Sequence, residues 1–258
     1  MTVNQTIKFA LRNKVPRERE QHPDESGQYV KHTKTNILDS LGIGHTTKTK
    51  IGNEFIRGVS GGERKRVSLA EMMAGHGPMQ FWDQPTRGLD SKTALGFAET
   101  LRDEADRNGK TIVATMYQAG NGIYNQFDKV LVLADGCTIY YGPSGMAQHY
   151  FERLGFVCPR GANIADFLTS VTVTTERVIA PGAKGKVPTT PQEFESVYQQ
   201  SSLCQQMRES EEPVEALAGE VEDLEVAVQR EKKQRRVDGP RSVYTVGLRD
   251  QIVNCTIR

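Results

Sequence analysis

The run Val-Ser-Gly-Gly-Glu-Arg-Lys-Arg-Val-Ser, residues Val59–Ser68, constrains the fold of this chain more than any other segment. Ser60 and Glu63 have the spacing of a capping box, in which each side chain bonds to the other residue's backbone N–H, so a helix is predicted to begin here. Gly61 and Gly62 carry no Cβ, and their N–H groups at the positive end of that helix can approach an anion closely. Taken alone, these residues also fit an ordinary helix start.

A second pattern, which follows the predicted helix, favours phosphate chemistry. The short apolar run Met79–Trp82 leads into Asp83, as a buried strand leads into a carboxylate that holds hydrated Mg²⁺. Pro85 ends the strand, and a helix is predicted to begin near Ser91. The β-branched run Thr111–Tyr117 then predicts a second buried strand. The order of phosphate loop, helix, strand with Asp, helix and strand predicts an α/β fold.

Residues 59–117 resemble the ATP-binding cassette of ABC transporters, a P-loop NTPase. Val59–Arg64 is similar to the family's signature loop, Met79–Asp83 to its Walker B strand, and Arg87–Asp90 to its D-loop. The resemblance implies that the signature loop binds ATP held on a partner cassette, that Asp83 binds Mg²⁺ through water, and that the D-loop helps the interface between cassettes. The residues so implied are Ser60, Gly61, Gly62 and Glu63 in the signature loop, and Arg87, Gly88, Leu89 and Asp90 in the D-loop.

Three departures from the family pattern narrow the resemblance. Gln84 stands where the family has its catalytic Glu, Arg87 where the D-loop opens with Ser, and Tyr117 where the switch His follows the next strand. A neutral amide cannot accept a proton from attacking water, and a phenol does not replace an imidazole in that role. With these three departures, the sequence resembles the first nucleotide-binding domain of fungal pleiotropic drug resistance transporters, the ABCG-like group. Further matching segments are Tyr140–Pro143, Tyr150–Phe156 and Ala165–Thr169.

The sequence contains no P-loop, the glycine-rich loop that would hold the phosphates of a nucleotide bound to this domain. No Gly-x-x-x-x-Gly-Lys-Ser/Thr occurs, and Gly109–Thr111 lacks the required upstream glycine. The resemblance places the Walker A loop, the Q-loop and the adenine-stacking segment upstream of Met1, so we expect the chain to be a fragment. No catalytic residue is expected to be intact, because Gln84 and Tyr117 occupy the degenerate positions. We therefore expect the chain by itself not to hydrolyse ATP, although the family is an ATP-hydrolysing translocase.

The resemblance divides the chain into three parts. Residues 1–180 are expected to form a partial nucleotide-binding domain, with a helical subdomain over about 1–75 and an incomplete sheet with a family extension over about 76–180. Residues 181–243 are expected to form a linker and a charged helix. Residues 244–258 resemble the interfacial elbow helix that precedes a membrane domain.

Local signals predict further elements within these parts. The polar segment Val15–Gln28 predicts a break between helices. Lys129–Tyr141 predicts a β-hairpin with a two-residue Asp-Gly turn, where positive φ is tolerated. Pro143 is predicted to open a helix that Gly155 ends and whose aromatic stripe packs in a core. The Pro- and Gly-rich segment Ala180–Pro191 predicts a linker.

Composition excludes several classes of site. The formal net charge of +1 argues against an electrostatically driven nucleic-acid binder. The 4 cysteines and 5 histidines show neither zinc spacing nor a disulfide framework, so no metal site is expected from side-chain clusters alone. No uninterrupted apolar run approaches the roughly 20 residues that a membrane helix needs.

The resemblance implies export driven by ATP, with ATP and Mg²⁺ as cofactors. The expected location is the cytoplasmic face of a membrane, expected to be the plasma membrane. The expected partners are a second nucleotide-binding domain, the transmembrane domains of the same transporter and, near the basic run Arg230–Arg236, the membrane surface. Nucleic acid is not expected, and a DNA-repair ATPase is disfavoured because no long coiled coil interrupts the cassette. A soluble, non-hydrolysing regulatory module that pairs with a cassette is the alternative, because the lost catalytic groups fit it too.

Overall fold

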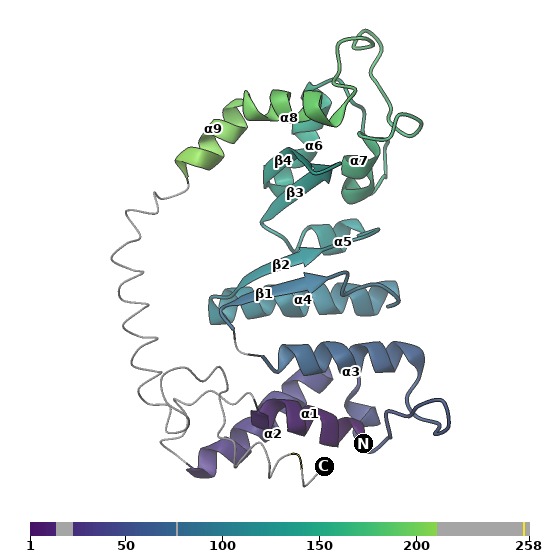
Figure 1. Ribbon diagram of the computed structural model, residues 1–258, viewed down its shortest axis with the longest axis vertical. Coiled ribbons are helices and arrows are strands. Elements are labelled where there is room, and N and C mark those ends of the chain that lie inside the picture. Colours follow the sequence, from purple (N-terminus) through teal and green to yellow (C-terminus); the bar gives the residue numbers. More distant parts are fainter. Residues whose placement is uncertain (14–22, 76, 211–254, 256–258) are drawn as a thin grey trace. The chain divides into compact units, whose positions relative to one another are not determined.

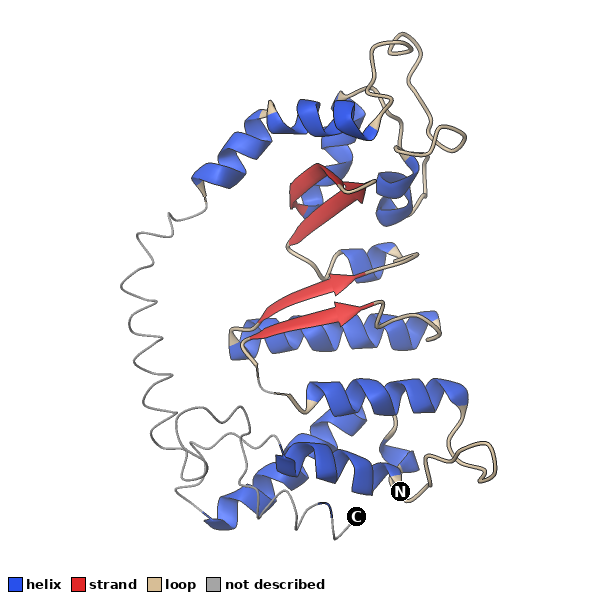
Figure 2. Cartoon of the chain, in the orientation of Figure 1, coloured by secondary structure: helices blue, strands red, loops and turns tan. Residues whose placement is uncertain are grey.

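A computed structural model describes residues 1–13, 23–75, 77–210 and 255 (Figure 1). The described residues form two compact units, one over Met1–Thr115 and one that begins at Met116. Both units contain helices and strands, which confirms the predicted α/β class (Figure 2). The predicted charged helix, the basic run after it and nearly all of the predicted elbow helix lie outside the described residues.

The first unit begins with helices that surround an apolar core. They are α1 (Val3–Asn13), α2 (Pro23–Ser40), the short 3-10 helix η2 (Gly44–Thr46) and α3 (Gly61–Met73). The prediction that the break extends to Gln28 is wrong, because α2 begins at Pro23. Proline is favoured at the first position of a helix, where its fixed φ suits the helix and no N–H partner is needed.

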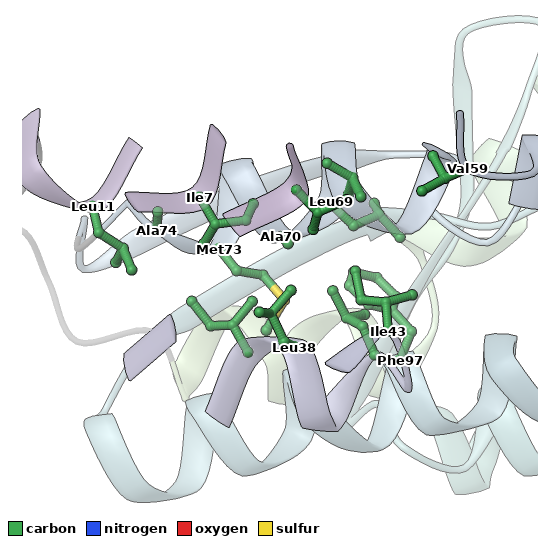
Figure 3. Close-up of a cluster of buried hydrophobic side chains, with 14 of the residues drawn as sticks. Ile7, Leu11, Leu38, Ile43, Val59, Leu69, Ala70, Met73, Ala74 and Phe97 are labelled. Carbon is green, nitrogen blue, oxygen red and sulfur yellow. The ribbon is translucent and has the colours of Figure 1, made fainter. Parts of the chain in front are cut away.

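One buried cluster joins these helices to the helix that follows the first strand (Figure 3). The cluster members labelled there are Ile7, Leu11, Leu38, Ile43, Val59, Leu69, Ala70, Met73, Ala74 and Phe97. The start of the chain also bonds to the segment before α3: the Val3 N–H donates to the Thr49 carbonyl at 3.0 Å, and the Ile51 N–H donates to the Met1 carbonyl at 3.1 Å. The segment that leads into α3 is therefore held by the first residues of the chain, which are distant from it in sequence.

Two parallel strands complete the first unit. They are β1 (Met79–Asp83) and β2 (Thr111–Thr115), joined by α4 (Ser91–Asn108). Their register places Phe81 beside Val113 and Asp83 beside Thr115. Trp82 packs edge-to-face on Phe97 of α4, with ring centroids 5.3 Å apart. The last residues of both strands therefore lie at the same edge of the sheet.

The prediction that both strands are buried is wrong for one face of this sheet. The side chain of Phe81 is 69% exposed and that of Val113 is 47% exposed, whereas Trp82 is buried. Within the first unit, the helical core covers only the face that carries Trp82 and Ile112. β2 also ends at Thr115, two residues before its predicted end at Tyr117.

The second unit is built on an antiparallel hairpin. Strands β3 (Lys129–Ala134) and β4 (Cys137–Pro143) are joined by Asp135 and Gly136, with φ of 46° and 81°, which confirms the predicted turn. The helices of this unit are α5 (Asn121–Tyr124), α6 (Ser144–Arg153), α7 (Ile164–Ser170), α8 (Pro191–Gln199) and α9 (Ser202–Glu209).

An aromatic core holds the second unit together. The rings of Phe151 and Phe156 pack edge-on with centroids 6.5 Å apart, and Phe156 stacks on Phe194 of α8 at 5.6 Å. This confirms that the aromatic stripe of α6 is core. Val187 is buried in the same cluster, so the segment expected as a linker contributes to this core. The Tyr198 hydroxyl donates to the Tyr141 carbonyl at 2.8 Å and ties α8 to β4.

A side chain distant in sequence caps helix α7. Asn163 occupies the cap position but makes no side-chain cap bond. Instead, Asn121 Oδ1 accepts the Ile164 N–H at 2.8 Å, from 43 residues away in the sequence. Asn121 Nδ2 also donates to the Ala162 carbonyl at 3.4 Å. The start of α7 therefore depends on the start of α5.

We predict that Asn121→Ala in the full-length protein weakens the start of α7. Loss of a cap costs about 0.5–2 kcal/mol, or roughly 2–30-fold in the rate of amide exchange from the opened helix. Hydrogen–deuterium exchange of the peptide that contains residues 164–170 measures this. Asn125→Ala, at an exposed position just after α5, is the matched control and should leave that peptide unchanged. Equal exchange in both variants would contradict the assignment of the cap.

Candidate functional site

The signature-like loop has the predicted capping box at the start of α3. The Ser60 N–H donates to Glu63 Oε2 at 2.8 Å, and the Glu63 N–H donates to Ser60 Oγ at 3.3 Å. The bond from the Ser60 N–H is the main cause that holds the pKa of Glu63 below its usual value, and the His45 ring adds to it. These reciprocal bonds fix the backbone through which the chain enters α3.

The two glycines of this loop face open space. A Cβ added to Gly61 or Gly62 would meet no atom within 4 Å, and neither residue has a positive φ. Neither internal packing nor backbone conformation therefore requires glycine at these positions. Because these residues have no Cβ atom, an anion can approach the N–H groups at the positive end of α3. This arrangement binds phosphate in many proteins.

Two side-chain contacts that sequence reasoning missed join α3 to the turn over residues 41–46, one made by a side chain of the turn and one by a side chain of the helix. His45 Nε2 lies 3.1 Å from Glu63 Oε1, and Arg66 Nη1 donates to the Leu41 carbonyl at 3.1 Å. The partners are 18 and 25 residues apart in sequence. No local spacing indicates such pairs, because they arise only when the turn packs beside α3.

The end of β1 carries the candidate Mg²⁺ ligand. Asp83 is exposed, and its Oδ1 accepts a hydrogen bond from Thr115 Oγ1 at 2.6 Å. The Gln84 N–H donates to the same hydroxyl at 2.9 Å. Carboxylate oxygens and water are the ligands that Mg²⁺ prefers, and an exposed carboxylate at a strand end fits an ion bound together with a nucleotide.

The D-loop-like turn leads into α4. Asp90 is the cap of α4, and its Oδ2 accepts the Thr93 N–H at 3.1 Å. Hydrogen bonds from Thr93 hold the pKa of Asp90 below its usual value, and the charge of Arg66 contributes. Arg87 and Gly88 are exposed, Gly88 has a φ of 80°, and Leu89 packs at the edge of the core.

The structure brings only some of the predicted site residues together. Asp83 and Gln84 share one partner, Thr115, whereas Ser60 and Glu63 form a separate group with His45. Tyr117 belongs to the second unit, and its side chain is 68% exposed. Thr115 is a partner of Asp83 that the sequence does not reveal. The sequence predicts a strand that runs on to Tyr117, whereas the observed strand ends at Thr115, directly opposite Asp83.

The described part of the chain holds neither a cluster of metal-binding side chains nor a disulfide. No group of three His, Cys, Asp or Glu residues there could hold a metal ion. The four cysteines are free thiols. None of the helices that the structure describes combines the length and the apolar character needed to cross a membrane.

Comparison with known proteins relates the sequence of this chain to one family. The family model of the ABC transporter matches residues 2–87. ABC multidrug transporter G of Aspergillus fumigatus is 63% identical over 260 residues, which cover 100% of this chain and 19% of that protein. ABC multidrug transporter H of the same fungus is 45% identical and is covered to 18%. A solved dimeric bacterial ABC transporter cassette is 24% identical, with a TM-score of 0.39 over 46% of this chain and 48% of that one.

The chain spans about a fifth of the length of these two curated relatives. The match to ABC multidrug transporter G nevertheless extends over the whole of this chain. It includes the second unit, which lies beyond the residues that the family model matches. The signature-like loop and the strand that ends at Asp83 both fall inside the matched residues. The chain therefore contains part of an ABC transporter domain and, over its whole length, is homologous to part of the fungal ABC multidrug transporters.

Proposed function

We propose that this chain is part of the first nucleotide-binding domain of an ATP-driven efflux transporter and supplies the signature loop of a composite ATP site. The observation that carries the proposal is the capped, open start of α3, where Gly61 and Gly62 leave their N–H groups accessible. The identity of 63% to a fungal multidrug transporter supports drugs and other xenobiotics as the exported class. Export itself is an activity of the whole transporter of which this chain is proposed to be a part.

Each of the predicted site residues has a separate role at the composite site. Ser60, Gly61 and Gly62 contact the γ-phosphate of an ATP held on the partner cassette, while Glu63 fixes the loop and Asp90 supports the interface. Asp83 holds Mg²⁺ through water. The bound MgATP supplies the phosphoanhydride whose hydrolysis powers transport. The partners are thus a second nucleotide-binding domain and the transmembrane domains, at the cytoplasmic face of the plasma membrane.

The domain's own Walker B side does not hydrolyse ATP in this proposal. Gln84 is a neutral amide and cannot accept a proton from water, and Tyr117 is a phenol at the switch position. The loss of a positioned base costs roughly 10²–10⁴ in rate. The two ATP sites are therefore unequal: the one that Ser60 completes hydrolyses ATP, and the one that contains Gln84 retains it.

These same substitutions favour a second candidate function. A soluble module without catalysis could pair with a cassette and regulate it, and Gln84 and Tyr117 fit that function equally well. The two functions differ in what surrounds the chain, because only a transporter needs transmembrane domains in the same protein.

Photoaffinity labelling tests the proposed function. ATP with a photoreactive group on its γ-phosphate should label residues 59–64 in the intact transporter, because the loop lies against that phosphate. Replacing the P-loop Lys of the partner cassette should abolish the labelling, since the nucleotide is held there. Labelling that persists after this replacement would contradict the composite site. Labelling of a native protein that contains no membrane span would favour the regulatory module.

A further inference from the structure

One hydroxyl group joins the two residues that end strand β1. Thr115 is the last residue of β2 and lies opposite Asp83 in the parallel register. Its Oγ1 donates to Asp83 Oδ1 at 2.6 Å and accepts the Gln84 N–H at 2.9 Å. A threonine hydroxyl has one proton and two acceptor lone pairs, so both bonds can form at once. The proton points to the carboxylate because the Gln84 N–H already occupies the acceptor side.

The second bond holds a strained backbone. Gln84 has a φ of 43°, in the left-handed region that residues other than glycine seldom adopt. Its N–H bonds to Thr115, and its carbonyl accepts the Arg87 N–H at 3.2 Å. Such strain persists only where surrounding bonds fix the backbone. The hydroxyl of Thr115 therefore sets both the orientation of the Asp83 carboxylate and the direction in which the chain leaves the strand.

A threonine is also an ordinary strand residue, since β-branched side chains suit strands. Valine would serve that purpose equally, with the same shape and no hydroxyl. The short bond to an ionised carboxylate is the part that valine cannot supply, and such charge-assisted bonds are about twice as strong as neutral ones. The hydroxyl, rather than the shape of the side chain, is the feature that needs an explanation.

We propose that Thr115 is a positioning residue for Asp83, and that its hydroxyl holds the carboxylate in the orientation that binds the hydrated Mg²⁺ of a nucleotide. This inference rests on the proposed function, in which Asp83 is the Mg²⁺ carboxylate of the site that retains ATP. Residues that orient metal-binding groups from behind typically contribute 10–100-fold to metal affinity. Thr115 acts through Asp83 and does not itself contact the ion.

Mn²⁺ in place of Mg²⁺ provides a direct readout that does not depend on hydrolysis. In the intact transporter with a non-hydrolysable ATP analogue, electron paramagnetic resonance measures Mn²⁺ bound at the two ATP sites. We expect Thr115→Val to raise the half-saturating Mn²⁺ concentration of one site about tenfold. Thr115→Ser keeps the hydroxyl and should restore the value to within about twofold. The other site is the internal control for folding, because its Mn²⁺ affinity should not change.

Asp83→Asn separates the failure of this inference from the failure of the proposed function. If Asn removes Mn²⁺ from one site while Thr115→Val leaves both affinities unchanged, the positioning role is refuted and the proposed function stands. Equal weakening by Val and Ser would also refute the role, because the hydroxyl would then not matter. If Asp83→Asn changes neither site, Asp83 is not the Mg²⁺ carboxylate and the proposed function itself fails.

Discussion

Gly61→Ala in the intact transporter should lower drug-stimulated ATPase activity about 10²-fold without destabilising the domain. The added methyl group meets no atom of the chain within 4 Å, and alanine is a better helix former than glycine. Any loss of activity therefore comes from an external ligand that can no longer approach the N–H groups. A misplacement of about 1 Å at a reacting phosphate costs about 10²-fold in rate.

Ser60→Ala should lower the activity comparably, but for two reasons. It removes the hydroxyl from the phosphate side of the loop, and it breaks a capping bond worth about 1 kcal/mol of stability. Gln84→Ala should change the rate little, because no proton transfer depends on that amide. Ser68→Ala is the matched control for the helix, since its exposed hydroxyl only bonds back to the Arg64 carbonyl at 3.3 Å.

The measurement is the drug-stimulated ATPase rate of the purified transporter in lipid, together with its melting temperature. The site assignment is wrong if Gly61→Ala and Gln84→Ala reduce the rate equally. It is also wrong if Gly61→Ala lowers the melting temperature in proportion to the loss of rate, because the methyl group would then act on the fold.

The 258-residue chain expressed alone should be aggregated or molten. Met79, Phe81 and Val113 form an apolar patch on one face of the β1–β2 sheet, with exposed fractions of 54%, 69% and 47%. In the second unit, Leu131 and Leu133 of β3 are 53% and 59% exposed. Each such side chain left in water forfeits up to about 1.5–3 kcal/mol of burial, against a total domain stability of about 5–15 kcal/mol.

The backbone of the first sheet adds to this expectation. Within the described residues, β1 pairs only with β2, so each strand has an edge with unpaired N–H and C=O groups. Exposed apolar edge strands pair readily with other chains. A longer chain that adds the P-loop segment should be soluble, because the added strands would pair with a free edge of this sheet and cover its apolar face.

Light scattering, near-ultraviolet circular dichroism and binding of a hydrophobic dye test this prediction. The double variant Phe81→Thr and Val113→Thr should reduce dye binding, since it removes apolar surface and keeps strand-forming residues. Glu99→Thr, on the exposed side of α4, is a control that leaves the patch intact. A monodisperse monomer with a sharp cooperative melt would contradict the prediction and favour the self-contained regulatory module.

Much of the local structure could be predicted because its causes lie within a few residues. The helix start at Ser60 depends on Glu63, three residues on, and the hairpin turn depends on the Asp-Gly pair. The start of α2 was missed because the polar composition before Gln28 resembles a loop, while the helix signal is one proline. The exposed face of β1 and β2 was missed as well, since an apolar run has the same sequence whether or not a layer covers it.

The candidate site shows the same division. The sequence by itself determined which residue types stand at positions 59–64, 83–84 and 87–90, and therefore the resemblance to the family. Only the tertiary structure decided which side chains support them. Thr115 reaches Asp83 across 32 residues and His45 reaches Glu63 across 18, through strand register and through packing of a turn on a helix. Such contacts depend on how separate elements meet in space, which no spacing along the chain encodes.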